Sequence, residues 1–215
     1  MIMQKTPSLI LASSSITRRA LLDRLNIPYQ IDKPEIDEQV QAGEQAAAAC
    51  LRLAQQKAHT VALRHPQAVV IGSDQLVACG NHILGKPHSA ERAFTQLRML
   101  SGQTILFHVA VAVIDTHGRI QTSFETVTAH MRDLTDAEIN HYIAQERPFD
   151  CAGSMKSEGL GVTLLESMHS CDPTAIMGLP LIATARLLRG AGINPLGTSD
   201  QILCAARSWR SPPSC

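Results

Sequence analysis

The stretch that decides the fold is LILASSSITRR, residues 9–19. The apolar residues 9–12 are typical of a buried strand, and they end at consecutive serines. Arg18 and Arg19 follow, in a pattern that predicts a helix to about Leu25. A strand that runs through a serine turn into a helix directs backbone N–H groups and the positive end of the helix dipole to one point. These residues therefore indicate a phosphate site, although a serine N-cap followed by two solvated arginines explains them equally well.

Outward from this stretch, strand patterns and helix patterns alternate. Strands are predicted near 29–31, 69–71, 76–78, 82–84, 104–114, 120–131 and 162–165, and helices over 44–63, 89–100, 135–145 and 178–190. Gly80-Asn81 is typical of a hairpin turn, and Thr135 with Glu138 has the spacing of a capping box. The alternation predicts an α/β or α+β fold with a mixed sheet. No linker-like stretch interrupts it, so any two lobes must be tightly joined.

The composition limits the kinds of partner. Hydrophobic residues make up 45% of the 215 residues and aromatic residues only 3%, which predicts a mainly aliphatic core. The 19 basic and 19 acidic residues balance, so net charge favours neither a nucleic acid nor an anionic membrane as a partner. An anion site must therefore be local.

The cysteines and the chain ends indicate a cytoplasmic protein. The six cysteines show no Cys-x-x-Cys pair and no matching histidine spacing, so a zinc site and a disulfide framework both lose support. No signal-peptide pattern precedes the first strand, and the N-terminal apolar stretch is too short to span a bilayer. Residues 198–215 are predicted to form a disordered or loosely attached tail.

Several charged residues could serve a common chemical purpose. Asp74 comes directly after a predicted strand, Lys57 lies in a predicted helix, Lys86 lies in a loop, and an acidic loop spans 35–38. Each has an ordinary interpretation by itself, as a turn former, a solvated lysine or a wet acidic surface. Together they indicate a metal-assisted site for a polyphosphate.

Longer segments resemble landmarks of the Maf family. In family order they are ASSSITRRALLDRL (12–25), EIDE (35–38), RLAQQKA (52–58), IGSDQLV (71–77), ILGKP (83–87), LRMLSGQT (97–104), AGSMKSEGLG (152–161) and MGLPL (177–181). On these segments the chain is identified as a member of the family. The resemblance implies one Maf-like domain over 1–197, built on a mixed, twisted sheet flanked by helices. Its two tightly joined lobes lie around a nucleotide cleft.

The resemblance also implies an activity and a set of site residues. Maf-like proteins are nucleoside triphosphate pyrophosphatases, which release a nucleoside monophosphate and pyrophosphate with the help of a divalent cation (Mg²⁺, Mn²⁺ or Co²⁺). Carried over residue by residue, the resemblance makes Asp74 the proton acceptor, places Glu38 and Asp74 at the metal, and gives phosphate contacts to Ser13, Arg18, Lys57 and Lys86.

Three positions divide the family by substrate, and they fall at Thr17, Gln75 and Glu158. Gln75 and the run around Glu158 resemble the branch that acts on 7-methyl-GTP, whereas the dTTP and UTP branch has Thr and Gln there. A carboxylate can accept hydrogen bonds from N1–H and the 2-amino group of guanine, and it complements the charge of the 7-methylated base. Thr17 departs from the Trp that relatives in this branch can carry.

Two alternatives to a 7-methyl-GTP pyrophosphatase stay open at this point. One is a pyrophosphatase of the dTTP and UTP branch, and the other is a nucleotide-binding regulator of cell division without turnover. A homodimer is possible under each of the three hypotheses.

Overall fold

The computed structural model describes residues 7–197, and the apolar run before the serine turn forms its first strand. The strands are β1 (Ser8–Ala12), β2 (Gln30–Ile31), β3 (Ala68–Cys79), β4 (His82–Leu84), β5 (Thr104–Ile114), β6 (Ile120–Met131) and β7 (Leu165–His169). The helices are α1 (Ile16–Asp23), α2 (Ala46–Ala62), α3 (Ala90–Leu100), α4 (Asp136–Glu146) and α5 (Leu181–Gly190), with 3₁₀ turns η1 (Ala152–Ser154), η2 (Leu160–Leu164) and η3 (Ala175–Met177).

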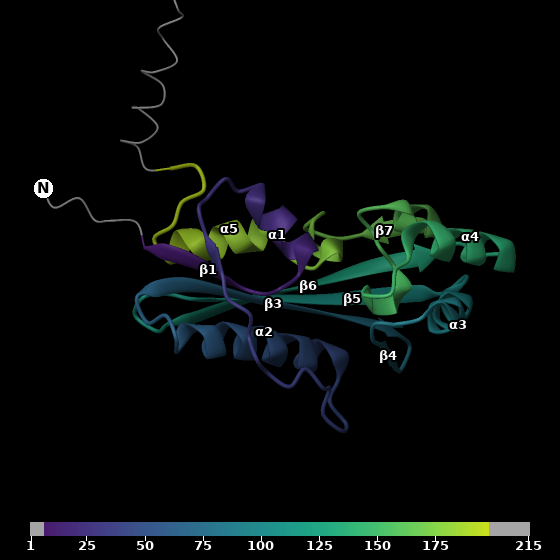
Figure 1. The fold of residues 1–215 in the computed structure, drawn as a ribbon, viewed down its shortest axis with the longest axis horizontal. Helices are drawn as coiled ribbons and strands as arrows, with labels where there is room; N and C mark the ends of the chain where they lie inside the picture. The colour runs from purple at the N-terminus through teal and green to yellow at the C-terminus, as the bar shows by residue number, and fades with distance from the viewer. Residues whose placement is uncertain (1–6, 198–215) are drawn as a thin grey trace, which may run out of the picture.

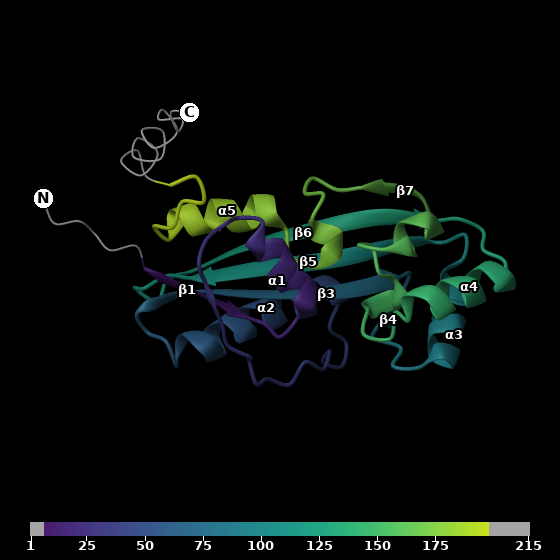
Figure 2. The same cartoon turned by 45° about the horizontal axis from the view of Figure 1, so that its top comes forward.

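All strands belong to one seven-stranded mixed sheet with the order β2-β1-β3-β5-β6-β7, and β4 also pairs with β3. The β2–β1 and β1–β3 pairs are parallel, and every other pair is antiparallel. Helix α2 covers one face, whereas α1 and α5 lie on the other (Figures 1 and 2). The predicted mixed sheet flanked by helices is confirmed.

Alternation along the central strands builds a core on each side of the sheet. On one face, Ala110 and Ala112 of β5 pack against α2. On the other face, Val111 and Val113 pack with α1 and α5, while Phe107 and Val109 pack with α3 and α4 further along the same strand. This second face thus carries two groups of helices, one at each end of the sheet.

Strand β3 corrects one expectation. The sequence predicted two short strands separated by a polar loop at GSDQ, but β3 continues through it, and β5 pairs with it from Val70 to Ala78. Asp74 is therefore in the middle of a strand and not in a loop after one. Ser73 is accommodated in the strand because its hydroxyl has two carbonyl acceptors within hydrogen-bond distance, Ala110 at 2.8 Å and Gly178 at 2.9 Å.

The expected strand at 162–165 is also wrong. Residues Leu160–Leu164 form η2, and the strand starts only at Leu165. The Thr163 hydroxyl donates to the Leu160 carbonyl at 2.7 Å, which closes this turn locally. The other elements lie close to their expected bounds, and the Thr135 capping box is present.

One edge of β3 is open in its middle. Strand β1 pairs with β3 up to Ala12 opposite Gly72, and β4 pairs on the same edge only from Val77. Within the described residues, Ser73–Leu76 therefore has no strand partner on this edge. An unpaired edge leaves backbone N–H and C=O groups that a ligand can contact.

Along the unpaired stretch of β3, which we call the opening, successive side chains point to opposite faces of the sheet. A Cβ on Gly72 would overlap the backbone of α2 at Ala54 and Ala58, so Gly72 faces α2 and permits close packing. Asp74, two residues on, faces α2 as well, while Ser73 and Gln75 face the opposite side. None of the described helices has the length and apolar character needed to cross a membrane.

Candidate active site

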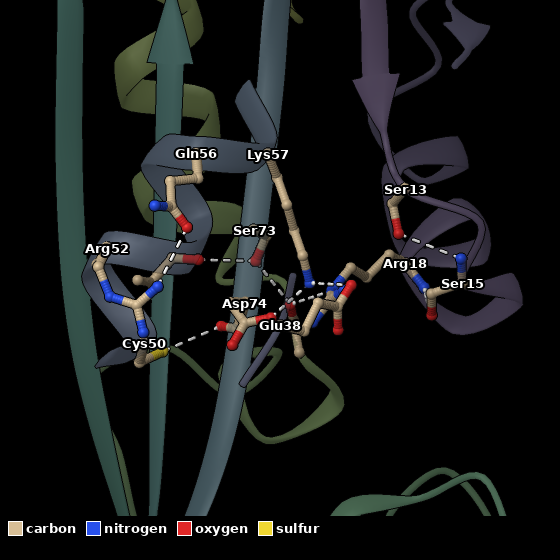
Figure 3. Close-up of polar contacts among 12 residues, drawn as sticks. Ser13, Ser15, Arg18, Glu38, Cys50, Arg52, Gln56, Lys57, Ser73 and Asp74 are labelled. Carbon is tan, nitrogen blue, oxygen red and sulfur yellow. Dashed lines mark hydrogen bonds and ion pairs between the residues drawn. The ribbon is translucent and has the colours of Figure 1, made fainter. Parts of the chain in front are cut away.

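The Lys57 side chain occupies the centre of a buried charged group on the α2 face. Lys57 lies in the buried stripe of α2 and is only 4% exposed. Its ammonium group donates to Asp74 Oδ1 at 2.6 Å and lies 3.0 Å from Glu38 Oε1. Figure 3 shows Lys57, Asp74 and Glu38 converging. The ordinary interpretation of Lys57 as a solvated lysine is therefore wrong.

Cys50, to which the sequence alone assigned no role, fixes the backbone at Asp74. Its thiol lies 3.3 Å from the Asp74 carbonyl oxygen and 3.1 Å from that of His108. Burial, followed by the charge of Asp74, raises the pKa of this thiol to about 12. The thiol therefore stays protonated and acts as a hydrogen-bond donor, not as a nucleophile.

The serine turn forms the other side of the opening. The Ser13 hydroxyl accepts from the Ser15 amide at 3.1 Å, and the Ser15 hydroxyl caps α1 by accepting from the Arg18 amide at 3.3 Å. In the described residues, the amides of Ile16 and Thr17 make no hydrogen bond within the protein. They are two of the free donors that the first turn of a helix offers to an anion.

Gly178 joins the serine turn to β3. Its carbonyl oxygen accepts from Arg18 Nε at 2.9 Å and from Ser73 Oγ at 2.9 Å. Its φ is +96°, a conformation that favours glycine, and a Cβ there would lie 3.1 Å from Gln75 Oε1. Arg18 is thereby held beside the part of β3 that carries Asp74, and Figure 3 shows both side chains between β3 and the serine turn.

A pocket of about 780 Å³ lies on the face opposite α2, between α1 and the end of α4. Thr17, Arg18, Gln75, Lys86 and Glu158 all line it. Asp74, Lys57, Glu38 and Ser13 are not among its lining residues. The predicted site residues therefore form two groups, with Asp74, Lys57 and Glu38 on the α2 side of β3 and the pocket residues on the other, while Ser13 lies in the serine turn after β1.

The three expected specificity residues lie together in this pocket. Thr17 Oγ1 donates to Glu158 Oε1 at 2.9 Å, and Gln75 Nε2 donates to the Ile176 carbonyl at 2.8 Å. Thr17 thus orients the Glu158 carboxylate. Glu158 Oε2 makes no hydrogen bond to any other described residue, and Glu158 lines the pocket.

Helix α4 holds the segment that carries Glu158. The buried Tyr142 hydroxyl donates to the Ser154 carbonyl at 3.1 Å and accepts from the Lys156 amide at 2.9 Å. Glu146 accepts from the Leu160 amide and pairs with Lys156 Nζ at 2.9 Å. These contacts fix the backbone on both sides of Glu158, a role for Tyr142 and Glu146 that the sequence alone did not indicate.

Comparison with known proteins identifies the family of this site. The model of the family described as "Maf-like protein" matches residues 8–191. The chain belongs to the Maf family.

Relatives of this Maf chain share nearly its whole length. A 7-methyl-GTP pyrophosphatase of Bordetella avium (strain 197N) is 51% identical over 90% of this chain and 98% of that protein. Another 7-methyl-GTP pyrophosphatase, of Thiobacillus denitrificans (strain ATCC 25259 / T1), is 45% identical over 89% and 96%, respectively. Among solved structures, the Staphylococcus aureus Ham1 protein covers 59% of this chain and 72% of its own at 14% identity, with a TM-score of 0.43.

The described side chains of the Maf chain do not form a complete metal site by themselves. No cluster of three or more His, Cys, Asp or Glu residues within 7–197 could hold a metal ion. However, the carboxylates of Glu38 and Asp74 already converge on one cation, the Lys57 ammonium. Mg²⁺ is commonly held by one or two carboxylates together with substrate phosphates. The donor set therefore fits a divalent cation that binds with a polyphosphate.

Proposed function

We propose that this chain hydrolyses the bond between the α- and β-phosphates of 7-methyl-GTP, giving 7-methyl-GMP and pyrophosphate. The observation that carries the proposal is the position of Asp74 and Gln75, consecutive residues at the open edge of β3 that face opposite sides of the sheet. One nucleotide can place its base on the Gln75 side and its phosphates on the Asp74 side. The names of relatives at 51% and 45% identity support this substrate.

The base occupies the pocket beside Glu158. Guanine offers N1–H and a 2-amino group on one edge, and the Glu158 carboxylate accepts both. Thr17 keeps this carboxylate in place through its 2.9 Å hydrogen bond, so less side-chain freedom is lost on binding. The negative charge also attracts the positively charged 7-methylated base, whereas a uracil carbonyl would be repelled.

The phosphates cross the open edge toward α2. Arg18 and Lys86 line the pocket near the opening, and Lys57 lies beyond it. Ser13 and the free amides at the start of α1 supply hydrogen-bond donors to the same charge. Since phosphoryl transfer depends mainly on neutralising and positioning these oxygens, such a set of groups suits the reaction.

Asp74 takes the proton of the attacking water. The water oxygen forms a bond to the α-phosphorus, the bridging bond to the β-phosphate breaks, and its electron pair leaves with pyrophosphate. Asp74 Oδ1 is hydrogen-bonded to Lys57, and Oδ2 makes no hydrogen bond to another described residue, which leaves it available for the proton. A divalent cation held by Glu38 and Asp74 would neutralise phosphate charge and acidify the water.

We expect 7-methyl-GTP to be hydrolysed with a higher kcat/KM than GTP, UTP or dTTP when Mg²⁺ is present. The Glu158 carboxylate favours a guanine edge, and the methylated base adds charge attraction. A coupled pyrophosphate assay measures this panel, with Mn²⁺ and Co²⁺ compared under the same conditions. Chelation of the cation should stop turnover.

Either of two results would contradict this proposal and favour another function. A higher kcat/KM with UTP or dTTP as substrate would assign the chain to the pyrimidine branch. Nucleotide binding without pyrophosphate release under any of these cations would instead support a regulator that binds without turnover.

A further inference from the structure

Glu38 lies in a long connection that has no regular secondary structure to hold it in place. Residues 32–45, between β2 and α2, contain neither helix nor strand. The Glu38 side chain is 57% exposed, although it reaches the buried Lys57. A hollow of about 620 Å³ separates this connection from α2 and is lined by Asp37, Gln39 and Arg52. Packing therefore does little to fix Glu38, and polar contacts must do so.

Two arginines of the α2 region hold the two ends of this connection. Arg52 donates to both carboxylate oxygens of Glu44, at 2.8 and 2.6 Å. Arg64 donates to both carboxylate oxygens of Asp32, at 2.9 and 2.8 Å. Each arginine also donates to a backbone carbonyl of the connection, Arg52 to Gln39 at 3.2 Å and Arg64 to Lys33 at 2.9 Å.

We call the hydrogen bonds of Arg52 to Glu44 and Gln39 the Arg52 clamp, and those of Arg64 to Asp32 and Lys33 the Arg64 clamp. The Arg52 clamp acts next to the site because Gln39 follows Glu38 in the chain. Arg52 also donates to Gln56 on the same helix at 3.1 Å, which orients the guanidinium. Hydrogen bonds from Arg52 hold the pKa of Glu44 at about 2, so this pair stays ionised at any ordinary assay pH. The Arg64 clamp is chemically similar but holds the far end of the connection.

We propose that Arg52 is a positioning residue for the reaction, which holds the Glu38 carboxylate at Lys57 and at the divalent cation. This inference rests on the proposed function, in which Glu38 contributes to the cation site. Arg52 makes no hydrogen bond to Asp74 or Lys57, so its positioning effect passes through the connection that carries Glu38, whereas its charge, which also acts on Asp74, is kept in Arg52→Lys.

The test is the Mg²⁺ concentration that gives half-maximal turnover of 7-methyl-GTP. Arg52→Ala should raise this concentration by about 10-fold, in the range seen when partners of metal ligands are removed. Glu38→Gln should raise it at least as much, and adding Arg52→Ala to Glu38→Gln should change little further. Arg52→Lys should rescue only in part, because an ammonium cannot reproduce the forked contact.

Arg64→Ala is the matched control, because it removes the same type of clamp from the other end. It should leave the Mg²⁺ requirement unchanged. Thermal unfolding shows whether each variant is folded, and Arg52→Lys carries the test if Arg52→Ala is not.

The inference is overturned if the effects of Arg52→Ala and Glu38→Gln multiply in the double variant. It is also overturned if Arg64→Ala raises the Mg²⁺ requirement as much as Arg52→Ala does. If Glu38→Gln has no effect while Asp74→Asn abolishes turnover, the role of Glu38 and this inference fail together, whereas the proposed reaction stands. If wild-type protein releases no pyrophosphate from any nucleotide, the proposed function itself has failed.

Discussion

Asp74→Asn is expected to lower kcat for pyrophosphate release from 7-methyl-GTP by about 10³-fold, within the range for loss of a general base. Asparagine keeps the size of the side chain and can still contact Lys57, so the fold and nucleotide binding should survive. It cannot accept the proton of the attacking water. At a Mg²⁺ concentration raised to offset the weaker amide ligand, KM should change far less than kcat, and steady-state kinetics with pyrophosphate detection separate the two parameters.

The control for this variant is Asp115→Asn. Asp115 is also a nearly buried carboxylate paired with a cation, Arg119 at 2.7 Å, but it lies in the turn between β5 and β6. It should keep wild-type kcat at temperatures where it is folded. An Asp74→Asn protein as active as wild type would remove Asp74 from its proposed role.

Glu158→Gln is expected to make 7-methyl-GTP a poorer substrate, with kcat/KM lowered by about 30-fold, or about 2 kcal/mol, the usual worth of a hydrogen bond to a charged group. The amide oxygen can still accept one hydrogen bond, but its NH₂ opposes the donors of guanine, and the attraction for the methylated base is lost. UTP turnover should fall much less or rise, because glutamine can pair with both donors and acceptors of uracil. Comparing kcat/KM between the two nucleotides measures the change.

Glu166→Gln makes the same chemical change at an exposed position on β7, outside the pocket, and should alter the turnover of neither substrate. If Glu158→Gln changes kcat/KM by the same factor whether the substrate is UTP or 7-methyl-GTP, Glu158 does not select the base.

Much of the fold could be predicted because local signals agreed with the final structure. The capping box at Thr135 and the long alternating patterns of β5 and β6 gave correct elements. The continuity of β3 was missed because Gly72, Ser73 and Asp74 have low strand propensity. Pairing with β5 and the contacts of Ser73 outweigh that local preference, and neither is visible in the local sequence.

The candidate site residues were predicted as a set, but their arrangement in space was not. The family resemblance gathered Ser13, Arg18, Lys57 and Asp74, yet the division of the site between two faces depends on where β1 and β4 stop pairing with β3. The burial of Lys57 had a signal, since it falls in the same helical stripe as Cys50 and Ala54. The Arg52 clamp had none, because its partners lie on an irregular segment.

In the proposed complex, one nucleotide spans the open edge of β3. The most direct measurement is a crystal structure of the full chain with Mg²⁺ and the α,β-methylene analogue of 7-methyl-GTP, which cannot be hydrolysed at that bond. The base should contact Glu158 and Gln75, and the phosphate chain should pass Ser73–Leu76 so that the α-phosphorus faces Asp74. Arg24 and Arg147 also line the pocket, and a triphosphate that stays beside them, away from Asp74, would contradict the account.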